Sequence, residues 1–183
     1  EMSASLVGSE MCIRDSHIGS ETLWAYCAEL KKTKVIIFAL CVQGRLKAMI
    51  NLVHYNIGAG TMIAIPSESF IQILKTSDDI QMHVILFSLP FVHETNLDKS
   101  IIDTFYIINE HPLLPLPEKI FNIYTDTFSL LTRICKDVPF LLSRATLKSI
   151  LEALLQGFTE LSQRKALLQV APVSYTHLTL PTT

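Results

Sequence analysis

The histidines of this chain are the first residues that could do chemistry, because imidazole is a common metal ligand and acid–base group. Between residues 17 and 172 they are His17, His54, His83, His93 and His111. None of them lies two or four residues from another histidine or from a suitable carboxylate on a shared face. A zinc site needs three or four ligands that converge. We therefore expect no metal site and no cofactor, and we interpret these histidines as isolated polar residues.

The residues that could form a nucleophile or a phosphate site also lack the necessary context. Ser67 and Ser69 flank Glu68 in a polar turn, without the Gly-x-Ser-x-Gly pattern of a nucleophile elbow. The run Gly58-Ala59-Gly60 is followed by a strand pattern, whereas a phosphate-binding loop leads into a helix. We therefore predict no catalytic residues and a protein that is not an enzyme.

The cysteines and the longest apolar run indicate a cytoplasmic protein without a membrane span. Cys27, Cys41 and Cys135 are odd in number and widely spaced, which supports neither a zinc site nor a disulfide framework. Reduced thiols are typical of the cytosol. The apolar run 35–42 is far shorter than the roughly 20 residues that cross a bilayer.

The charge of the chain excludes a nucleic-acid surface in this segment. The formal net charge is −2, and three acidic residues and one basic residue lie in the first 16 positions, so the remainder is formally neutral. Its densest basic cluster, Lys31-Lys32 with Lys34, is interpreted as a solvated turn. Binding to DNA needs a larger basic footprint. The apolar content of 49% is high, so we expect part of the surface to meet a partner.

Both ends of the chain resemble translated sequencing adapters. Residues 11–16 can be encoded by ATGTGTATAAGAGACAG, and the reverse complement of that string encodes Val-Ser-Tyr-Thr-His, which is the sequence of residues 173–177. We therefore exclude residues 1–16 and 173–183 from the fold, as one excludes a fusion scar, and expect residues 1–16 to be disordered. The remainder is expected to be a fragment of a longer parent protein.

The first part of the remainder, residues 17–95, is predicted to consist of short strands. Residues 35–42 are apolar on both faces, as in a strand that is covered on both sides. A tight turn at Gln43-Gly44-Arg45 leads to residues 46–52, in which apolar and polar residues alternate. We predict a second turn at 55–60 and further strands at 62–65, 70–74 and 80–88. This spacing is typical of an antiparallel sandwich or barrel.

The second part, residues 96–172, changes to a helical period. We predict helices at 97–108, 118–137 and 141–163, with a proline-rich connector at Pro112, Pro115 and Pro117. The last two helices are joined by a short loop and should pack as an antiparallel pair. The predicted fold class is therefore α+β, with an antiparallel β-barrel followed by a pair of helices.

The order of these motifs resembles the N-terminal cupin-like sensor domain of AraC-type transcription regulators. The resemblance lies in the strand and hairpin at 38–52, the glycine turn and strand at 55–66, the strand at 70–73 and the His111–Leu116 connector before two helices. It implies a jelly-roll barrel that senses a small molecule, a homodimer and a DNA-binding domain of paired helix-turn-helix units. No such unit is present here, so DNA binding is implied for the parent protein only.

On this interpretation the ligand lies inside the barrel and the last helix forms the dimer. The candidate lining residues are Phe38, Leu40, Ile50, Ile63 and Ile65, with Tyr55 and His83 as polar contacts. The candidate dimer interface is the apolar stripe Leu147, Ile150, Leu151, Leu154 and Phe158. Two alternatives remain open. One is a stand-alone cupin-fold binder or sugar-isomerase-like enzyme, and the other is a dimerisation module whose barrel is filled by its own side chains.

Overall fold

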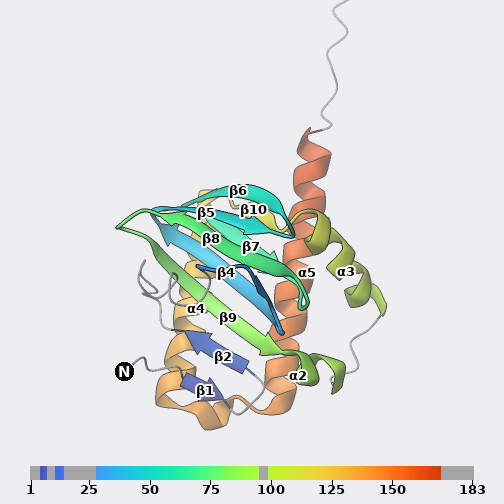
Figure 1. Ribbon diagram of the computed structural model, residues 1–183. Coiled ribbons are helices and arrows are strands. Elements are labelled where there is room, and N and C mark those ends of the chain that lie inside the picture. Colours follow the sequence, from blue (N-terminus) through green and yellow to red (C-terminus); the bar gives the residue numbers. More distant parts are fainter. Residues whose placement is uncertain (1–4, 8–10, 15–27, 95–98, 170–183) are drawn as a thin grey trace, which may run out of the picture.

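The strands of the protein form two antiparallel sheets that face each other (Figure 1). The structure is a computed structural model that describes residues 5–7, 11–14, 28–94 and 99–169. The strands lie in the order β1-β2-β9-β4-β7-β10 in sheet A and β3-β8-β5-β6 in sheet B. Their bounds are β1 (Ser5–Val7), β2 (Met11–Arg14), β3 (Lys31–Lys32), β4 (Val35–Gln43), β5 (Arg45–Ile50), β6 (Val53–Gly58), β7 (Thr61–Ile65), β8 (Phe70–Thr76), β9 (Gln81–Ser88) and β10 (Leu113–Pro115).

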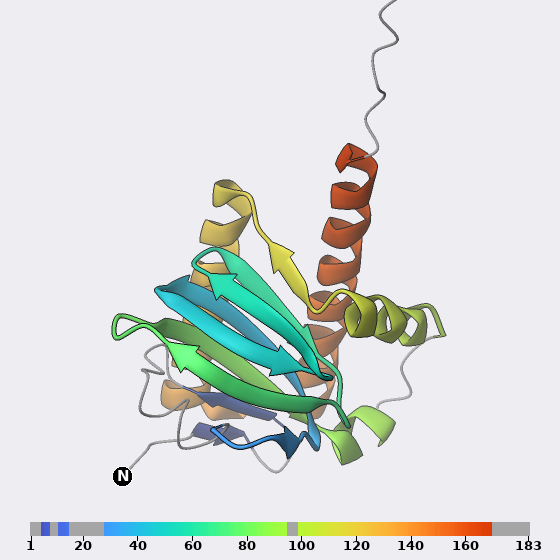
Figure 2. The same cartoon turned by 45° about the horizontal axis from the view of Figure 1, so that its top comes forward.

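The helical segments are α2 (Leu89–Glu94), α3 (Lys99–Glu110), α4 (Glu118–Asp137), the short 3-10 helix η1 (Pro139–Leu141) and α5 (Arg144–Gln169). Among the described residues, the long helices α4 and α5 cover the outer face of sheet A, while α3 lies beside α5 and α2 follows the end of β9 (Figures 1 and 2). Pro139 forces the turn between the two long helices, and the Ser143 hydroxyl accepts a hydrogen bond from the Thr146 amide (3.2 Å) to cap the start of α5. The predicted α+β fold, an antiparallel two-sheet sandwich followed by helices, is confirmed. No helix in the described ranges is both long and apolar enough to span a membrane.

The hairpin between β5 and β6 differs from the prediction, which placed a turn at 55–60. Asn51 and Leu52 form an additional turn, with positive φ values of 47° and 67°, and residues 53–58 are a strand, so that only Ala59 and Gly60 of the predicted segment form a turn, before β7. The Asn51 side chain holds this backbone, because it accepts a hydrogen bond from the Phe70 amide (2.9 Å) and donates one to Asn109 (3.1 Å). Leucine rarely adopts positive φ, so its type did not indicate a turn.

Residues in the first 16 positions also differ from the expectation of disorder. Segments 5–7 and 11–14 form β1 and β2, and β2 pairs with β9 from Met11↔Phe87 to Arg14↔Val84. The main chain of β9 would otherwise present an open edge on this side, and an open edge can pair with an extended segment of any sequence. Main-chain pairing therefore accounts for strands where the residue types predicted none.

Two apolar layers hold the fold together, one on each face of sheet A. In the central strand β4, alternate residues belong to different layers: Ala39 and Cys41 face sheet B, while Phe38 and Leu40 face the helices. The layer between sheet A and the helices contains aromatic contacts, such as the edge-on pair Phe38–Phe87 with ring centroids 6.4 Å apart. Sheet A is thus the shared wall of both layers.

The apolar stripe of α5 is part of the second layer, which corrects the predicted dimer interface. Leu147, Leu151, Leu154 and Phe158 pack against sheet A and the neighbouring helices and are at most 5% exposed. A second copy cannot reach them without unfolding α5 from its own subunit. Ile150 is half-buried at the edge of this layer. The sequence showed an apolar stripe, but not whether a sheet of the same chain covers it.

A pair of phenylalanine variants tests this packing. Replacing the fully buried Phe158 with alanine should lower the free energy of unfolding by about 3–5 kcal/mol, because it removes a ring and leaves a cavity. The matched control is Phe140→Ala in η1, where the ring is 80% exposed and the change should cost at most about 0.5 kcal/mol. Urea unfolding followed by circular dichroism measures both. Equal losses in the two variants would contradict the placement of α5.

Candidate functional site

The space between the two sheets is the first candidate binding site, and apolar side chains from both sheets fill it. Alternation along each strand directs every second residue into this space. The buried residues that pack together there are Ala39, Cys41, Leu46, Ala48, Ile50, Ile57, Ile63, Ile65, Ile73, Ile80, Met82 and Val84. None of these side chains carries a charge, so the space offers apolar contact and little else.

A cavity of about 80 Å³ remains in the middle of this layer. Its lining consists of alanine, leucine, isoleucine, valine and methionine side chains, with no polar group among them. Such cavities stay free of water and can take small apolar molecules. Pockets for drug-sized ligands are larger, about 300–1,000 Å³. A ligand of that size would therefore have to move the surrounding side chains or separate the two sheets.

The structure brings four of the seven predicted lining residues to this space. Ile50, Ile63 and Ile65 line the cavity directly. Tyr55 is half-buried and packs against the same layer from β6, opposite Ala48 on β5. These four residues remain the candidates for ligand contact.

The other three predicted lining residues, Phe38, Leu40 and His83, lie on the wrong face of sheet A. Phe38 and Leu40 belong to the layer under the helices, and the His83 ring lies 6.0 Å from that of Phe128 on α4. Leu40 and His83 are direct cross-strand partners, so they share this face. The prediction failed because β4 is apolar on both sides, and its sequence does not distinguish the two faces.

Several residues that line the cavity were not predicted, although the alternation of apolar and polar residues indicated some of them. In β5, Leu46, Ala48 and Ile50 alternate with more polar residues, which identifies the inward face of that strand. Only Ile50 was selected from this set. Met82 could also have been found, because it lies between the polar residues Gln81 and His83 in β9, whereas no polar residue alternates with Ala39 in the middle of β4.

Cys41 is a buried thiol in this layer, and its surroundings make it unreactive. Burial raises the pKa of the Cys41 thiol to about 11, and the negative charge of Asp79 acts in the same direction. The thiolate, which is the reactive form, is therefore rare at neutral pH. Sγ makes only weak contacts, to the carbonyl oxygens of Gln43 (3.6 Å) and Gly44 (3.9 Å). Cys41 acts as a small core residue, as its position in an apolar strand predicted.

A second candidate site is an apolar groove between α4 and α5. Its volume is about 530 Å³, and we call it the helix groove. It is lined by Ile120, Ile123, Tyr124, Thr127, Leu131, Ile150, Ala153, Leu154, Gly157, Glu160, Leu161 and Arg164. Tyr124 reaches across the groove to α5, where a Cβ at Gly157 would lie 2.5 Å from its hydroxyl oxygen. The glycine inside α5, which costs helix propensity, therefore makes room for the tyrosine.

Side chains that could hold a metal ion are not gathered in the part of the chain that the structure describes. No group of three or more histidine, cysteine, aspartate or glutamate residues converges there. His17, Cys27 and the other residues outside the described ranges are not placed. His54 and His111 are exposed, whereas His83 is buried, so these histidines occupy separate environments.

Comparisons with known proteins find similarity in fold only. No protein-family model and no curated protein matches the chain. Similar solved structures include ToxT from Vibrio cholerae with an unsaturated fatty acid bound, with TM-score 0.47 and 12% identity over 86% of this chain and 56% of that chain. Others are the cupin domain of Schizosaccharomyces pombe Cnp3, with TM-score 0.34 and 8% identity over 50% and 67% of the chains, and a Bacteroides fragilis cupin protein, with TM-score 0.35 and 14% identity over 51% and 75%.

These similar structures are thus two cupin proteins and ToxT. The chain spans a little more than half the length of the ToxT chain, 56%. At identities this low the likeness concerns the fold and not the ligand.

The raised pKa of Cys41 predicts a loss of stability at alkaline pH. In the unfolded chain the thiol ionises near its ordinary pKa of 9.0, whereas in the folded protein it ionises near 11. Between these values the unfolded state binds fewer protons, so stability falls as the pH rises. Urea unfolding between pH 8.5 and 11 should show an extra loss on the order of 1 kcal/mol relative to Cys41→Ala, after allowance for solvent screening. Parallel pH profiles of the two proteins would refute this.

Proposed function

We propose that this chain is the ligand-sensing and dimerisation domain of an AraC-type transcription regulator, and that its ligand is a small apolar molecule. The observation that carries the proposal is the cavity between the two sheets, whose lining is wholly apolar. The order of strand, turn and helix motifs supports the assignment to a regulator rather than to another cupin-fold protein.

The lining of the cavity limits the chemistry of the ligand. A charged or strongly polar group would lose its hydration there without gaining a hydrogen bond. Hydrocarbon transferred from water gains about 0.8 kcal/mol for each buried CH₂ group. The ligand is therefore an alkyl chain or a small ring, and any polar group it carries lies toward Tyr55 at the edge of the layer.

Sheet A provides the route from the ligand to the helices. Ala39 lines the cavity while Phe38 and Leu40, its neighbours on β4, pack under α4 and α5. A ligand that shifts β4 slightly therefore changes the packing of both helices, because the side chains of a protein interior are close-packed. The ligand shifts the equilibrium only as far as it binds one arrangement better than the other.

The remaining parts of the proposal follow from the regulator role. DNA binding belongs to a further domain of the parent protein, and the protein acts in the cytoplasm. The domain itself is a binding module rather than an enzyme, which is consistent with the separate placement of the described histidines. Metal analysis separates this from a cupin-fold isomerase, because a stoichiometric bound metal ion would favour the enzyme.

A series of primary alcohols from butanol to decanol tests the ligand site. Affinity should rise with chain length, and a ligand at 100 times its Kd should add about 2.7 kcal/mol to the free energy of unfolding. Ala39→Leu fills the cavity and should weaken binding at least about tenfold, since the longer side chain occupies the ligand's place.

The matched control for the alcohol series is Ala145→Leu, which makes the same change at an exposed position in the first turn of α5. It should bind the alcohols like the unchanged protein, as measured by thermal unfolding and calorimetry. Failure of every alcohol to stabilise the protein, or equal affinities of the two variants, would reject an apolar ligand between the sheets.

The dimer is proposed to form through the exposed side of α4, since the stripe of α5 is buried. Ile123 and Leu130 are 55% and 54% exposed and lie seven residues apart, which places them on one side of the helix. Ile123 also lines the helix groove, so the apolar surface continues from α4 toward α5. Such a patch can pair with itself about a two-fold axis.

Sedimentation of charged variants tests this dimer. Ile123→Asp should produce monomers, because a carboxylate in the apolar contact loses its hydration. The control is Asn122→Asp, which adds the same charge at the adjacent exposed position and should leave the dimer intact. A monomeric unchanged protein, or a dimeric Ile123→Asp variant, would reject this interface.

A further inference from the structure

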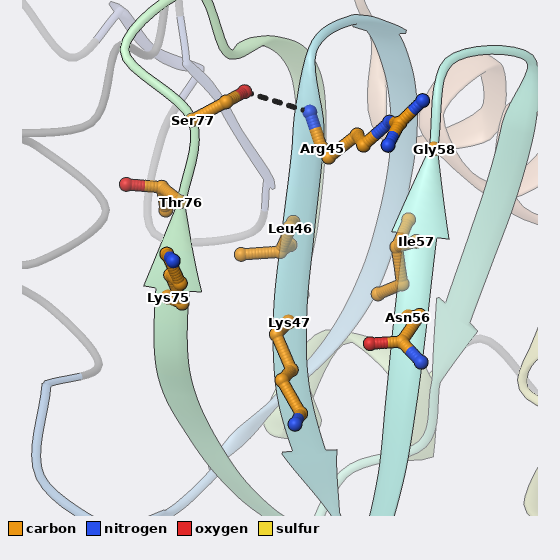
Figure 3. Close-up of a pocket in the computed structure, with 9 residues that line it drawn as sticks. All are labelled: Arg45, Leu46, Lys47, Asn56, Ile57, Gly58, Lys75, Thr76 and Ser77. Carbon is orange, nitrogen blue, oxygen red and sulfur yellow. Dashed lines mark hydrogen bonds between the residues drawn. The ribbon is translucent and has the colours of Figure 1, made fainter.

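A hollow on the outer face of sheet B gathers basic side chains, although the sequence as a whole is slightly acidic. Its volume is about 570 Å³, and residues from β5, β6, β8 and the segment just after β8 line it. They are Arg45, Leu46, Lys47, Asn56, Ile57, Gly58, Lys75, Thr76 and Ser77, and we call this site the basic hollow (Figure 3). Its basic side chains lie on the solvent face of sheet B, whereas Leu46 and Ile57 also line the apolar cavity, so the two sites share part of one wall.

Strand register fixes the positions of the charges. Lys47 is the direct cross-strand partner of Lys75 on one side and of Asn56 on the other, so the three residues form a row across β8, β5 and β6 (Figure 3). Arg45 follows two positions away on β5, on the same exposed face. Like charges directly opposite each other in a sheet repel. The row therefore places positive charges side by side at a cost to the folded chain.

The positive charges of Lys47 and Lys75 are not paired with acidic side chains among the residues that the structure describes. Asp79 is a carboxylate that interacts with Arg45: hydrogen bonds from Ser77 and Gln43 lower the pKa of Asp79, and the charge of Arg45 acts in the same direction. Within the described residues, side-chain ion pairs join Lys32 to Glu68, Arg144 to Glu94 and Lys148 to Glu152. None of these pairs uses Lys47 or Lys75.

The backbone around the basic hollow is held in place by local contacts. The Arg45 amide donates to the Ser77 hydroxyl (2.8 Å), and the Ser77 amide donates to the Arg45 carbonyl oxygen (2.9 Å). Gly44 has φ of +80° and lies so close to Ile80 that a Cβ would meet its backbone at 2.7 Å. The two turns are thus locked together, and they fix the start of β5 relative to the end of β8.

We infer that the basic hollow binds a small anion with two or more phosphate or carboxylate groups. Neighbouring strands are about 4.8 Å apart, so Lys47 and Lys75 suit two anionic groups on one small scaffold better than a single one. The Arg45 guanidinium can bind an oxyanion through two parallel N–H donors. The volume of the hollow lies within the range of about 300–1,000 Å³ that is typical of small-molecule sites. The inference goes beyond the proposed function and does not require an apolar ligand between the sheets.

Calorimetric titration of the full chain with tripolyphosphate and with citrate tests the inference, at low and at moderate salt. At least one anion should bind, and its affinity should fall as salt rises. Binding of tripolyphosphate alone assigns the site to phosphate groups, and binding of citrate alone assigns it to carboxylates. Binding of a DNA duplex with neither small anion would overturn the inference, as would no binding of any of the three.

Two double variants locate the site. Lys47→Gln with Lys75→Gln should weaken anion binding at least tenfold. In the absence of an anion, this double variant should be at least as stable as the unchanged protein, because it removes the repulsion between the two lysines. Lys119→Gln with Lys136→Gln removes the same charge from exposed positions on α4 and should bind like the unchanged protein. Equal binding by the two double variants would overturn the site. Circular dichroism and urea unfolding confirm that both variants fold.

Discussion

Burial of sheet A on both faces is the constraint on which the rest of the structure depends. Its central strand β4 pairs with β7 and β9, and successive residues of β4 belong to different apolar layers. Neither sheet B nor the helices can leave without exposing one face of this strand to water. The high apolar content of the chain, 49%, follows from a sheet that needs two apolar faces, since such strands carry apolar residues at every position.

The same constraint explains which parts of the fold the sequence could predict. β5 has one face toward water, and its alternation of Leu46, Lys47 and Ala48 identified both the strand and its inward side. The periods of α4 and α5 placed both helices nearly where they lie. In β4, however, Phe38 and Ala39 are equally apolar in pattern, so the sequence could not assign Phe38 to the helices and Ala39 to the cavity. The apolar stripe of α5 was likewise visible in the sequence, but the strands of sheet A that bury it are distant in the sequence.

Sheet B separates two environments with opposite chemistry. On β5, Leu46 and Ala48 face an apolar interior, while Arg45 and Lys47 face solvent at the basic hollow. Local sequence predicted the apolar side, because alternation is a property of one strand. The basic side depends on the pairing of Lys47 with Lys75, which are far apart in the chain and meet only through the register of β5 and β8. Charge clusters of this kind are absent from the linear sequence even when the fold class is correct.

The pairing of β2 with β9 has a consequence for how the protein is handled in the laboratory. The contact follows the main chain of residues 11–14 along residues 84–87, and main-chain hydrogen bonds are available to nearly any extended peptide. Purification tags or leader residues fused before position 28 can therefore compete for this border of sheet A. Tag choice would then alter melting temperature and aggregation without changing a single core residue, so biophysical measurements on differently tagged preparations are comparable only after the tags are removed.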